Sequence, residues 1–504
     1  MHNEATLEDI QSFHGQYPRQ IWYLFFSEMW ERFCFYGMRG MLTVFMISEL
    51  FFNEKDANLQ YGATQAFVYA FTFIGGLFAD KILGFRKSLF WGGLLMIAGS
   101  LILAVDPKTY FFLGIAFIIL GTGFFKPNIS TMVGLLYKPG DPRRDAGFSL
   151  FYAGINIGAL LGGYLCVAIG KQQMLTSIIP ADKAWNVAFG LTAIVMTISL
   201  LTFVFTKNHI GPIGLSPLKE KVNSKVGRYY EMAVYIGSIF LIPIVMTMVS
   251  KTQYTDLFMA IIGPATLIYL VYEMMKVDVA DRKKLIAALV FIVFSILFWA
   301  IYEQAGGSLA IFANYNVGDK LMGIKLDPNG VNNSANSFFV IILSFVIGSI
   351  WLWMNKRKIE PNTVIKFGLG FLFLAGAYFI FYATRFFADA NGVTSLNVFT
   401  TAYLVITLGE LCLSPIGLSI MTKLSPYKLQ GVMMGMWFLA SAYGQYVAGI
   451  LGAGMSTPSN DSSNIDRLMS YTNGYGQLAI YALIAGVILI VISPWVRKMM
   501  QEVK

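Results

Sequence analysis

Seven ionisable side chains lie inside stretches of the sequence that are otherwise apolar. They are Glu28, Glu31, Arg32, Arg39, Lys126, Glu303 and Glu410. On insertion scales a charge at the centre of a membrane helix costs about 2.5 to 3.5 kcal/mol, so each of these side chains requires a partner or a function. Four acids face three bases, and one proton would neutralise the set. This combination is typical of a carrier that couples the movement of a solute to protons.

The first apolar stretch places its polar side chains on one helical face. Glu28, Arg32, Tyr36 and Arg39 recur every three to four residues over roughly 16 Å, and we expect this stripe to line a cavity. Glu31 lies about 100° around the helix from Arg32, so one carboxylate is expected to pair with Arg32 while the other turns toward a neighbouring helix. Repulsion between two close acids favours a state in which one holds a proton. Local salt bridges that only hold the helices together are the alternative.

Lys126 and Glu410 suggest a dipolar binding site. Lys126 lies in the segment GTGFFKPN at 121–128, whose glycines and proline predict a kinked helix with freed backbone groups beside a cavity. Glu410 is followed by Ser414 and a proline, which predicts a second kink. A cation in the first half and an anion in the second suit a zwitterion with separated charges.

The composition identifies a membrane protein. Of the 504 residues, 56% are hydrophobic and 13% are charged, whereas soluble domains carry about 25% charged residues. This excludes soluble enzymes and nucleic-acid binders. The net charge of +9 comes from Lys and Arg in short clusters between apolar stretches, where membrane orientation explains it without a nucleic-acid partner.

Cysteine and histidine give no sign of a metal or a disulfide. Cys34, Cys166 and Cys412 all lie in apolar stretches and are expected to be small buried residues. The three histidines form no HExxH motif. We therefore expect no catalytic residue and no cofactor except the proton as coupling ion.

Fourteen stretches are long enough to span a membrane as helices. They lie near 21–48, 60–80, 88–105, 109–136, 147–169, 185–206, 230–250, 255–275, 285–314, 335–354, 364–384, 397–424, 429–455 and 475–496. Most Lys and Arg residues fall on one side if both termini are cytoplasmic, which is the orientation we expect in the plasma (inner) membrane.

Two basic breaks divide the fourteen stretches into six, two and six. This predicts an N-terminal six-helix bundle at 1–206, linkers and an inserted helix pair at 207–284, and a C-terminal six-helix bundle at 285–504. Two six-helix halves joined by a basic linker are the layout of major-facilitator transporters, which rock around a midplane site. We expect the all-α major-facilitator fold with 14 transmembrane helices.

Two further patterns concern the first bundle. The segment GGLFADKILGFRK at 75–87 resembles the major-facilitator motif GxxADxxGxR, in which Asp80 would accept from backbone donors or from Arg86 and lock the cytoplasmic face. A stripe of glycines every four residues, at 154, 158 and 162, allows a close helix approach, with packing as its expected role.

Six motifs in order resemble the proton-dependent oligopeptide transporter (POT/PTR) family. EMWERFCFYGMR at 28–39 resembles ExxERFxYYGMR, and GTGFFKPNIS at 121–130 resembles GTGxxKPNIS. The other four are DAGFSLFYAGINIG at 145–158, FWAIYEQ at 298–304, GELCLSPIGLS at 409–419 and MWF at 436–438. The resemblance covers nearly the whole chain and implies inward symport of di- and tripeptides with protons.

The resemblance also implies roles for particular residues. Proton coupling falls to Glu28, Glu31, Arg32 and Glu303, with Glu303 pairing with Arg39 across the two halves. Substrate binding falls to Arg32, Tyr36, Arg39, Tyr69, Lys126, Asn156, Trp299, Asn336, Glu410, Ser414 and Trp437. Gating or structural roles fall to Asp80, Arg86 and Asp145. The basic members would hold the peptide carboxylate, and Glu410 with the two asparagines would hold its amino end.

Two positions depart from the family pattern. Phe35 replaces the first tyrosine of a pair, which removes one hydroxyl contact. Ser337 replaces a proline beside Asn336, so the segment at 333–337 only loosely resembles the family's QSxNP. The aromatic residues also have an ordinary alternative role, because Tyr and Trp anchor membrane helices.

Other functions remain open at this point. The same fold could carry another small zwitterion or an anion, or bind peptides as a sensor without transport. An intramembrane enzyme is disfavoured because no nucleophile and base pair is apparent. We expect the lipid bilayer and peptide-like molecules as partners, no nucleic acid, and a monomer as the functional unit.

Overall fold

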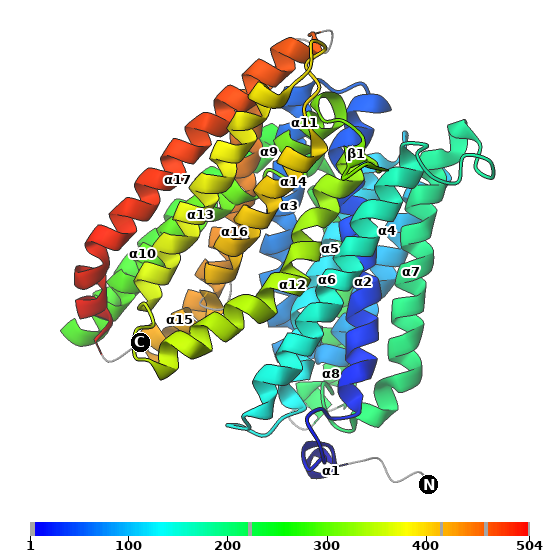
Figure 1. The fold of residues 1–504 in the computed structure, drawn as a ribbon. Helices are drawn as coiled ribbons and strands as arrows, with labels where there is room; N and C mark the ends of the chain where they lie inside the picture. The colour runs from blue at the N-terminus through cyan, green and yellow to red at the C-terminus, as the bar shows by residue number, and fades with distance from the viewer. Residues whose placement is uncertain (1–5, 220–223, 414–416, 458–461, 502–504) are drawn as a thin grey trace. The chain divides into compact units, whose positions relative to one another are not determined.

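The computed structural model describes residues 6–219, 224–413, 417–457 and 462–501, and nearly all of them are helical (Figure 1). The long helices are α2 (Gln20–Ser48), α3 (Glu54–Phe78), α4 (Phe85–Val105), α5 (Phe111–Leu135), α6 (Arg143–Gly170), α7 (Ala184–Thr206), α8 (Ser224–Ser250), α9 (Thr252–Met274), α10 (Val279–Tyr302), α12 (Pro328–Lys356), α13 (Thr363–Ala383), α14 (Leu396–Leu413), α16 (Gln430–Met455) and α17 (Asn464–Met500). These are the fourteen predicted membrane stretches.

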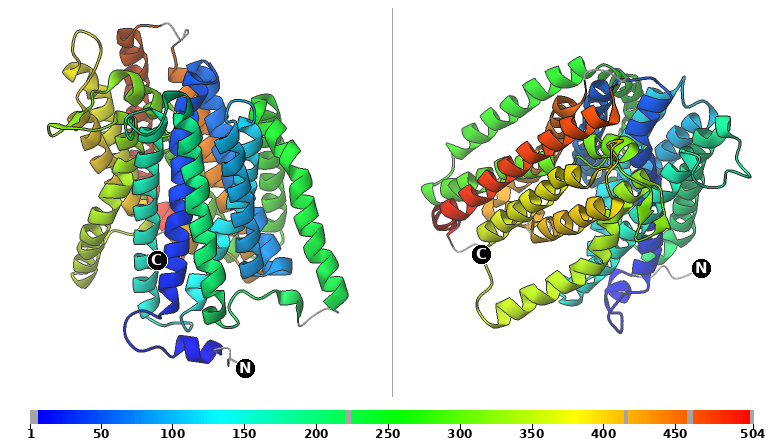
Figure 2. Two further views of the ribbon diagram at one scale, coloured as in Figure 1. Left: turned by 90° about the vertical axis from the view of Figure 1, so that its right-hand side faces the viewer. Right: turned by 45° about the horizontal axis from the view of Figure 1, so that its top comes forward.

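Short elements connect the long helices. They are α1 (Leu7–Gln11), α11 (Ser308–Asn316), α15 (Gly417–Leu424), the single turns η1 (Ala79–Leu83), η2 (Ala181–Lys183), η3 (Lys207–Ile210), η4 (Pro217–Lys219), η5 (Thr384–Phe387) and η6 (Tyr427–Leu429), and the antiparallel strands β1 (Lys320–Leu321) and β2 (Ile324–Lys325). In Figure 2 the dark-blue α1 lies crosswise at the starting end of α2.

Within the described residues, twelve of the long helices are apolar enough to cross a membrane. The other two are α2 and α16. The four charged residues of α2 lower its apolar character, and its most polar side chains are buried within the protein. The charged residues that lower the mean hydropathy of α2 are the same ones from which we expect proton coupling.

Two predicted stretches are each divided into two helices. The stretch at 285–314 breaks into α10 and α11 around Gly306, where a Cβ would collide with the ring of Tyr61. The stretch at 397–424 is divided into α14 and α15, with residues 414–416 outside the described chain. The length of the apolar stretch alone could not predict the first break.

Polar caps set the starts of several helices. Asp278 accepts the amide of Asp281 at 2.7 Å at the start of α10, and Asp327 accepts the amide of Gly330 at 2.7 Å at the start of α12. Ser463 forms a capping box with Asp466 at the start of α17. Each cap satisfies a backbone donor that a helix start leaves unpaired.

The contacts group the chain into two compact units. Unit 1 comprises Met1–Leu42 and Phe67–Ser250, and unit 2 comprises Thr43–Ala66 and Lys251–Lys504. Unit 2 thus includes the end of α2 and the start of α3, and the inserted pair is divided, with α8 in unit 1 and α9 in unit 2. The sequence boundaries at 206 and 284 stay predictions.

In unit 1, glycines bring α6 against α2. A Cβ on Gly158 would collide with the Met29 carbonyl, and one on Gly162 would collide with the Phe33 carbonyl. The glycine stripe therefore packs two backbones together, as expected, and it does so beside the charged residues of α2.

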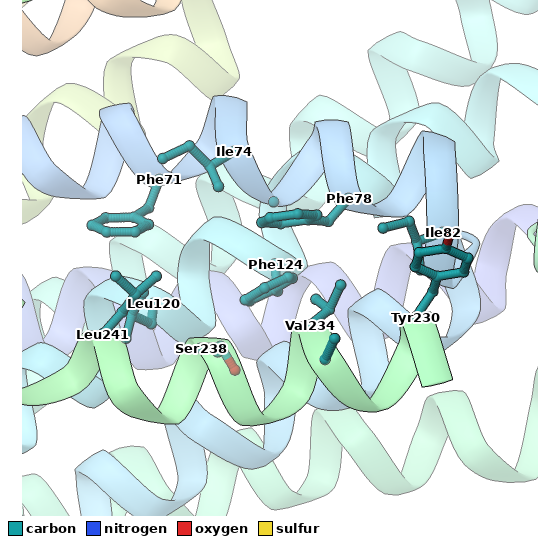
Figure 3. A pocket seen from close by; sticks show the side chains of 13 residues that line it. Phe71, Ile74, Phe78, Ile82, Leu120, Phe124, Tyr230, Val234, Ser238 and Leu241 are labelled. Atoms are coloured by element: carbon teal, nitrogen blue, oxygen red, sulfur yellow. The ribbon is translucent and has the colours of Figure 1, made fainter. Parts of the chain in front are cut away.

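The inserted helix α8 packs on α4 through polar contacts and leaves an apolar cavity against α3 and α5. Lys87 pairs with Glu231 at 2.6 Å, and the Trp91 indole donates to Ser238 at 2.9 Å. The cavity measures about 410 Å³. In Figure 3, Phe71 and Phe124 face α8 across it.

In unit 2, a buried ion pair fixes the start of α3. Arg467 Nε lies 2.5 Å from Glu54 Oε1, and the Tyr471 hydroxyl donates to Glu54 Oε2 at 2.8 Å. The two charged side chains are 6% and 1% exposed. Figure 1 shows α17, which carries Arg467, beside α13, with α14 on the other side of α13.

We predict that Gly162→Val lowers the stability of the protein by about 1 to 3 kcal/mol, because the new side chain must push α6 away from the Phe33 carbonyl. Thermal unfolding in detergent, followed by tryptophan fluorescence, measures the change. Gly237→Val is the control, since a Cβ there meets open space. Equal losses in both variants would contradict the close approach of α6 and α2.

Candidate functional site

In unit 1 a buried arginine lies between two carboxylates. Arg32 Nε lies 3.3 Å from Glu28 Oε1, its Nη2 donates to Glu31 Oε1 at 2.6 Å, and its Nε also donates to Glu31 Oε2. The three residues are 0 to 1% exposed. We call them the Arg32 cluster. Both carboxylates approach Arg32 Nε, so the expectation that only one of them would pair with Arg32 is wrong.

The Arg32 cluster contains one more negative charge than positive charge when its side chains are ionised. Among the described side chains, no donor reaches Glu28 Oε2, which is buried. A buried carboxylate oxygen without a donor is costly in a low-dielectric environment. One proton on either carboxylate would remove this excess negative charge.

Two more cations of unit 1 lie over aromatic rings. Lys126 Nζ is 4.6 Å from the centre of the Tyr69 ring, and the Arg39 guanidinium carbon is 5.7 Å from that of Tyr36. These distances fall in the range of cation–π attraction. Lys126 also attracts the Glu28 carboxylate electrostatically. Lys126 is therefore near the Arg32 cluster, and Arg39 lies on the same helix as the cluster.

Helix α5, which carries Lys126, continues through Pro127 from Phe111 to Leu135. The proline has no amide hydrogen, so the Gly123 carbonyl loses its usual helical donor. Gly75 of α3 packs directly on that carbonyl. The freed backbone group that the sequence predicts is the Gly123 carbonyl, and the glycines allow α3 to pack closely on it, whereas the predicted kink stays a prediction.

In unit 2 a carboxylate is held by neutral donors. Glu410 Oε2 accepts from the Tyr302 hydroxyl at 2.5 Å and from the Asn336 amide at 2.8 Å, and the same amide reaches Thr407 Oγ1 at 3.1 Å. We call these four residues the Glu410 cluster. Neutral donors orient a carboxylate without cancelling its charge, so this cluster can attract a cation.

Aromatic rings pack against Tyr302 of the Glu410 cluster. Trp299 contacts Tyr302 edge to face at 5.2 Å. Trp437 lies on α16 and is 9% exposed, with Gly417 packed against its ring. Ser414 lies outside the described residues. The uninterrupted course of α12 through Ser337 agrees with the loss of the family's proline.

The remaining predicted residues lie as follows. Asn156 donates to the Tyr152 carbonyl at 2.9 Å within α6, in unit 1, so its grouping with Glu410 of unit 2 stays a prediction. Glu303 ends α10 and is 4% exposed. Asp145 lies in the exposed first turn of α6, where the helix dipole favours an acid.

Arg86 has a structural role that its motif did not predict. Its Nε donates to the Ile213 carbonyl at 2.7 Å, and its Nη2 donates to the Gly211 carbonyl. It therefore ties the segment after α7 to the turn between α3 and α4. Asp80 is exposed, and its pairing with Arg86 stays a prediction.

The sequence reading missed four residues. Tyr302 and Thr407 each share a helical face with a predicted residue, three positions from Trp299 and Glu410 respectively, and that spacing could have selected them. Glu54 and Arg467 lie at the ends of apolar stretches, where charges ordinarily face water. Only the fold could show that these two are buried together.

Within the described residues, fourteen long helices that carry clusters of charged side chains are typical of a secondary transporter. Residues 86–498 match the family model described as "POT family". The chain is 33% identical to a peptide transporter of Yersinia enterocolitica, covering 98% of this chain and 97% of the relative. It is 27% identical to dipeptide and tripeptide permease A of Pectobacterium carotovorum, covering 99% and 96%.

A solved structure shows the same fold. The crystal structure of a POT peptide transporter in complex with alafosfalin matches with a TM-score of 0.81 and 31% identity, over 98% of this chain and 99% of that one. The chain therefore belongs to the POT family, a family of transporters and not of enzymes.

We predict that Arg32→Gln destabilises the protein by about 3 to 5 kcal/mol, because it leaves two buried carboxylates without a cation. Adding Glu31→Gln should restore part of the loss by removing one of those charges. Thermal unfolding of the single and double variants measures the coupling. A double variant less stable than Arg32→Gln alone would show that the two side chains do not act as an ion pair.

Proposed function

We propose that the protein is a proton-coupled symporter that imports di- and tripeptides by alternating access. The observation that carries this proposal is the Arg32 cluster, a buried set one proton away from neutrality. The peptide transporters and permeases that this chain resembles support the substrate class.

Protonation would make Arg32 available to substrate. In the present arrangement Glu28 and Glu31 occupy its Nε and Nη2. A proton on either acid weakens that hold, because a neutral carboxyl attracts a guanidinium much less than a carboxylate does. The peptide carboxylate could then bind Arg32 together with Arg39 and Lys126, and proton uptake would favour substrate binding.

The Glu410 cluster would hold the peptide amine. Tyr302 and Asn336 fix the orientation of the carboxylate by hydrogen bonds from neutral groups, so the carboxylate is positioned to attract an ammonium group. Trp299 beside Tyr302 supplies apolar area for a side chain. Arg32 would bind the carboxylate of the peptide main chain, and Glu410 would bind its amine. Every peptide has these two groups, so this arrangement suits a carrier of broad specificity.

The driving force would come from protons and membrane potential. An inside-negative potential of 100 mV supplies about 2.3 kcal/mol for each charge that enters with the peptide. We further propose that the protein lies in the plasma (inner) membrane with both termini cytoplasmic, works as a monomer and uses no cofactor besides the proton. The basic loops on one side support this orientation.

Uptake of labelled dialanine into proteoliposomes under an inward proton gradient and an inside-negative potential tests the proposal. We expect wild type to concentrate dialanine. Glu31→Gln should lose gradient-driven uptake and keep peptide counterflow, because Glu28 alone then balances Arg32 and the cluster reaches neutrality without taking up a proton. Glu410→Ala should lose both gradient-driven uptake and counterflow, since the variant has no Glu410 carboxylate to bind the peptide amine.

Glu8→Gln is the matched control, because Glu8 is exposed on α1, and it should transport like wild type. Transport of other zwitterions without dialanine would keep the carrier and reject the peptide assignment. Peptide binding with no flux of any solute would point to a sensor.

A further inference from the structure

A short β-hairpin lies between α11 and α12, entirely within unit 2 (Figure 1). Lys320 of β1 pairs with Lys325 of β2 in the antiparallel register. The residues between the two lysines, LMGI at 321–324, are all apolar. We call residues 321–324 the hairpin tip.

The hairpin tip combines a disfavoured backbone with uncovered apolar surface. Met322 and Gly323 form the turn, with φ angles of 50° and 85°. Such turns favour Asn or Asp before Gly, because most side chains are crowded at positive φ. Met322 is 88% exposed and Ile324 is 65% exposed, and no other described large apolar side chain is as exposed as Met322. Water gives no reason for a methionine at this position, so we infer an apolar partner outside the chain.

The hairpin is fixed against the start of α14. At its base the Gly318 amide donates to the Thr394 carbonyl at 2.9 Å. At its tip the Met322 amide donates to Asn397 Oδ1 at 2.8 Å. Asn397 lies in the first turn of α14, a helix long and apolar enough to cross a membrane. The tip is therefore at the level where α14 enters the bilayer.

The face of α14 beside the tip is turned away from the Glu410 cluster. Asn397, Thr401 and Leu404 follow one another by four and three residues on one helical face, and all three are exposed. Thr401 precedes Glu410 by nine residues, which is about half a turn around the helix. The hairpin tip thus lies on the outer side of α14, where a membrane helix meets lipid.

We propose that the hairpin tip inserts into the interfacial region of the phospholipid bilayer, with Met322 and Ile324 among the upper acyl chains. Lys320 and Lys325 would then reach the lipid phosphates, because lysine stems lie along apolar surface while their charged ends extend to the headgroups. The bilayer would cover the apolar side chains that the protein leaves exposed.

The charges of the hairpin favour phospholipid over a second copy of the chain. Like charges directly opposite each other on two strands are destabilising, and Lys320 faces Lys325 in this way. Asp319 lies 3.6 Å from Lys325 and can offset one of the two charges. Lipid phosphates compensate the excess, whereas a second hairpin would bring further lysines to it.

A fluorophore at position 324 reports whether the tip meets lipid. The native Cys34, Cys166 and Cys412 are buried, so Ile324→Cys supplies an exposed thiol for a nitrobenzoxadiazole label. In nanodiscs, phosphatidylcholine with a spin label high on its acyl chain quenches this fluorophore on contact. Asp182→Cys is the matched control, because Asp182 is exposed in the polar turn η2.

We expect the spin-labelled lipid to quench the label at 324 strongly and the label at 182 weakly. Met322→Asn suits a positive φ and removes the apolar side chain, so it should reduce quenching at 324 about fivefold. Met322→Leu keeps an apolar side chain and should keep the quenching. Thermal unfolding in the same nanodiscs verifies that each labelled variant is folded.

Equal quenching at 324 and 182 would overturn the proposal. Quenching at 324 that Met322→Asn leaves unchanged would overturn it as well, since the apolar tip would then not make the contact. Self-quenching of the label that rises with protein density in liposomes, without quenching by the lipid, would assign the tip to a second copy and reject the bilayer.

Discussion

The structure depends on the burial of Arg32 between Glu28 and Glu31. Three charges in a low-dielectric environment are tolerable only because they are within hydrogen-bond distance of one another. The pairing is incomplete, since one carboxylate oxygen of Glu28 has no donor within the described chain. An unpartnered carboxylate oxygen raises the free energy of the ionised cluster, and this favours uptake of a proton.

The surrounding helices are shaped to hold this cluster. Helix α6 presents glycines to α2, so its backbone approaches Met29 and the base of Arg32 with no side chain between them. Helix α5 presents Lys126 from a segment where Gly75 of α3 touches its backbone. Small residues in one half thus allow close backbone packing, and close packing keeps water and lipid away from the charges.

The sequence predicted most of the fold because apolar length and basic loops are strong signals in membrane proteins. It located Glu410 and Asn336, which the fold brings together. It could not show that both acids of α2 lie beside Arg32. Helical spacing fixes the direction in which a side chain leaves the helix, but it does not fix the rotamer that the side chain adopts. It also missed Glu54 and Arg467, whose burial arises from contacts between segments more than 400 residues apart in the chain.

The central claim is that peptide moves inward only with a proton on the Arg32 cluster. The most direct test follows dialanine and protons together in proteoliposomes that contain a pH-sensitive dye, with a dialanine gradient as the only driving force. The account predicts that dialanine entry acidifies the lumen in wild type, and that Glu31→Gln exchanges dialanine without acidification. Dialanine entry into wild-type vesicles with no change in internal pH would contradict the account.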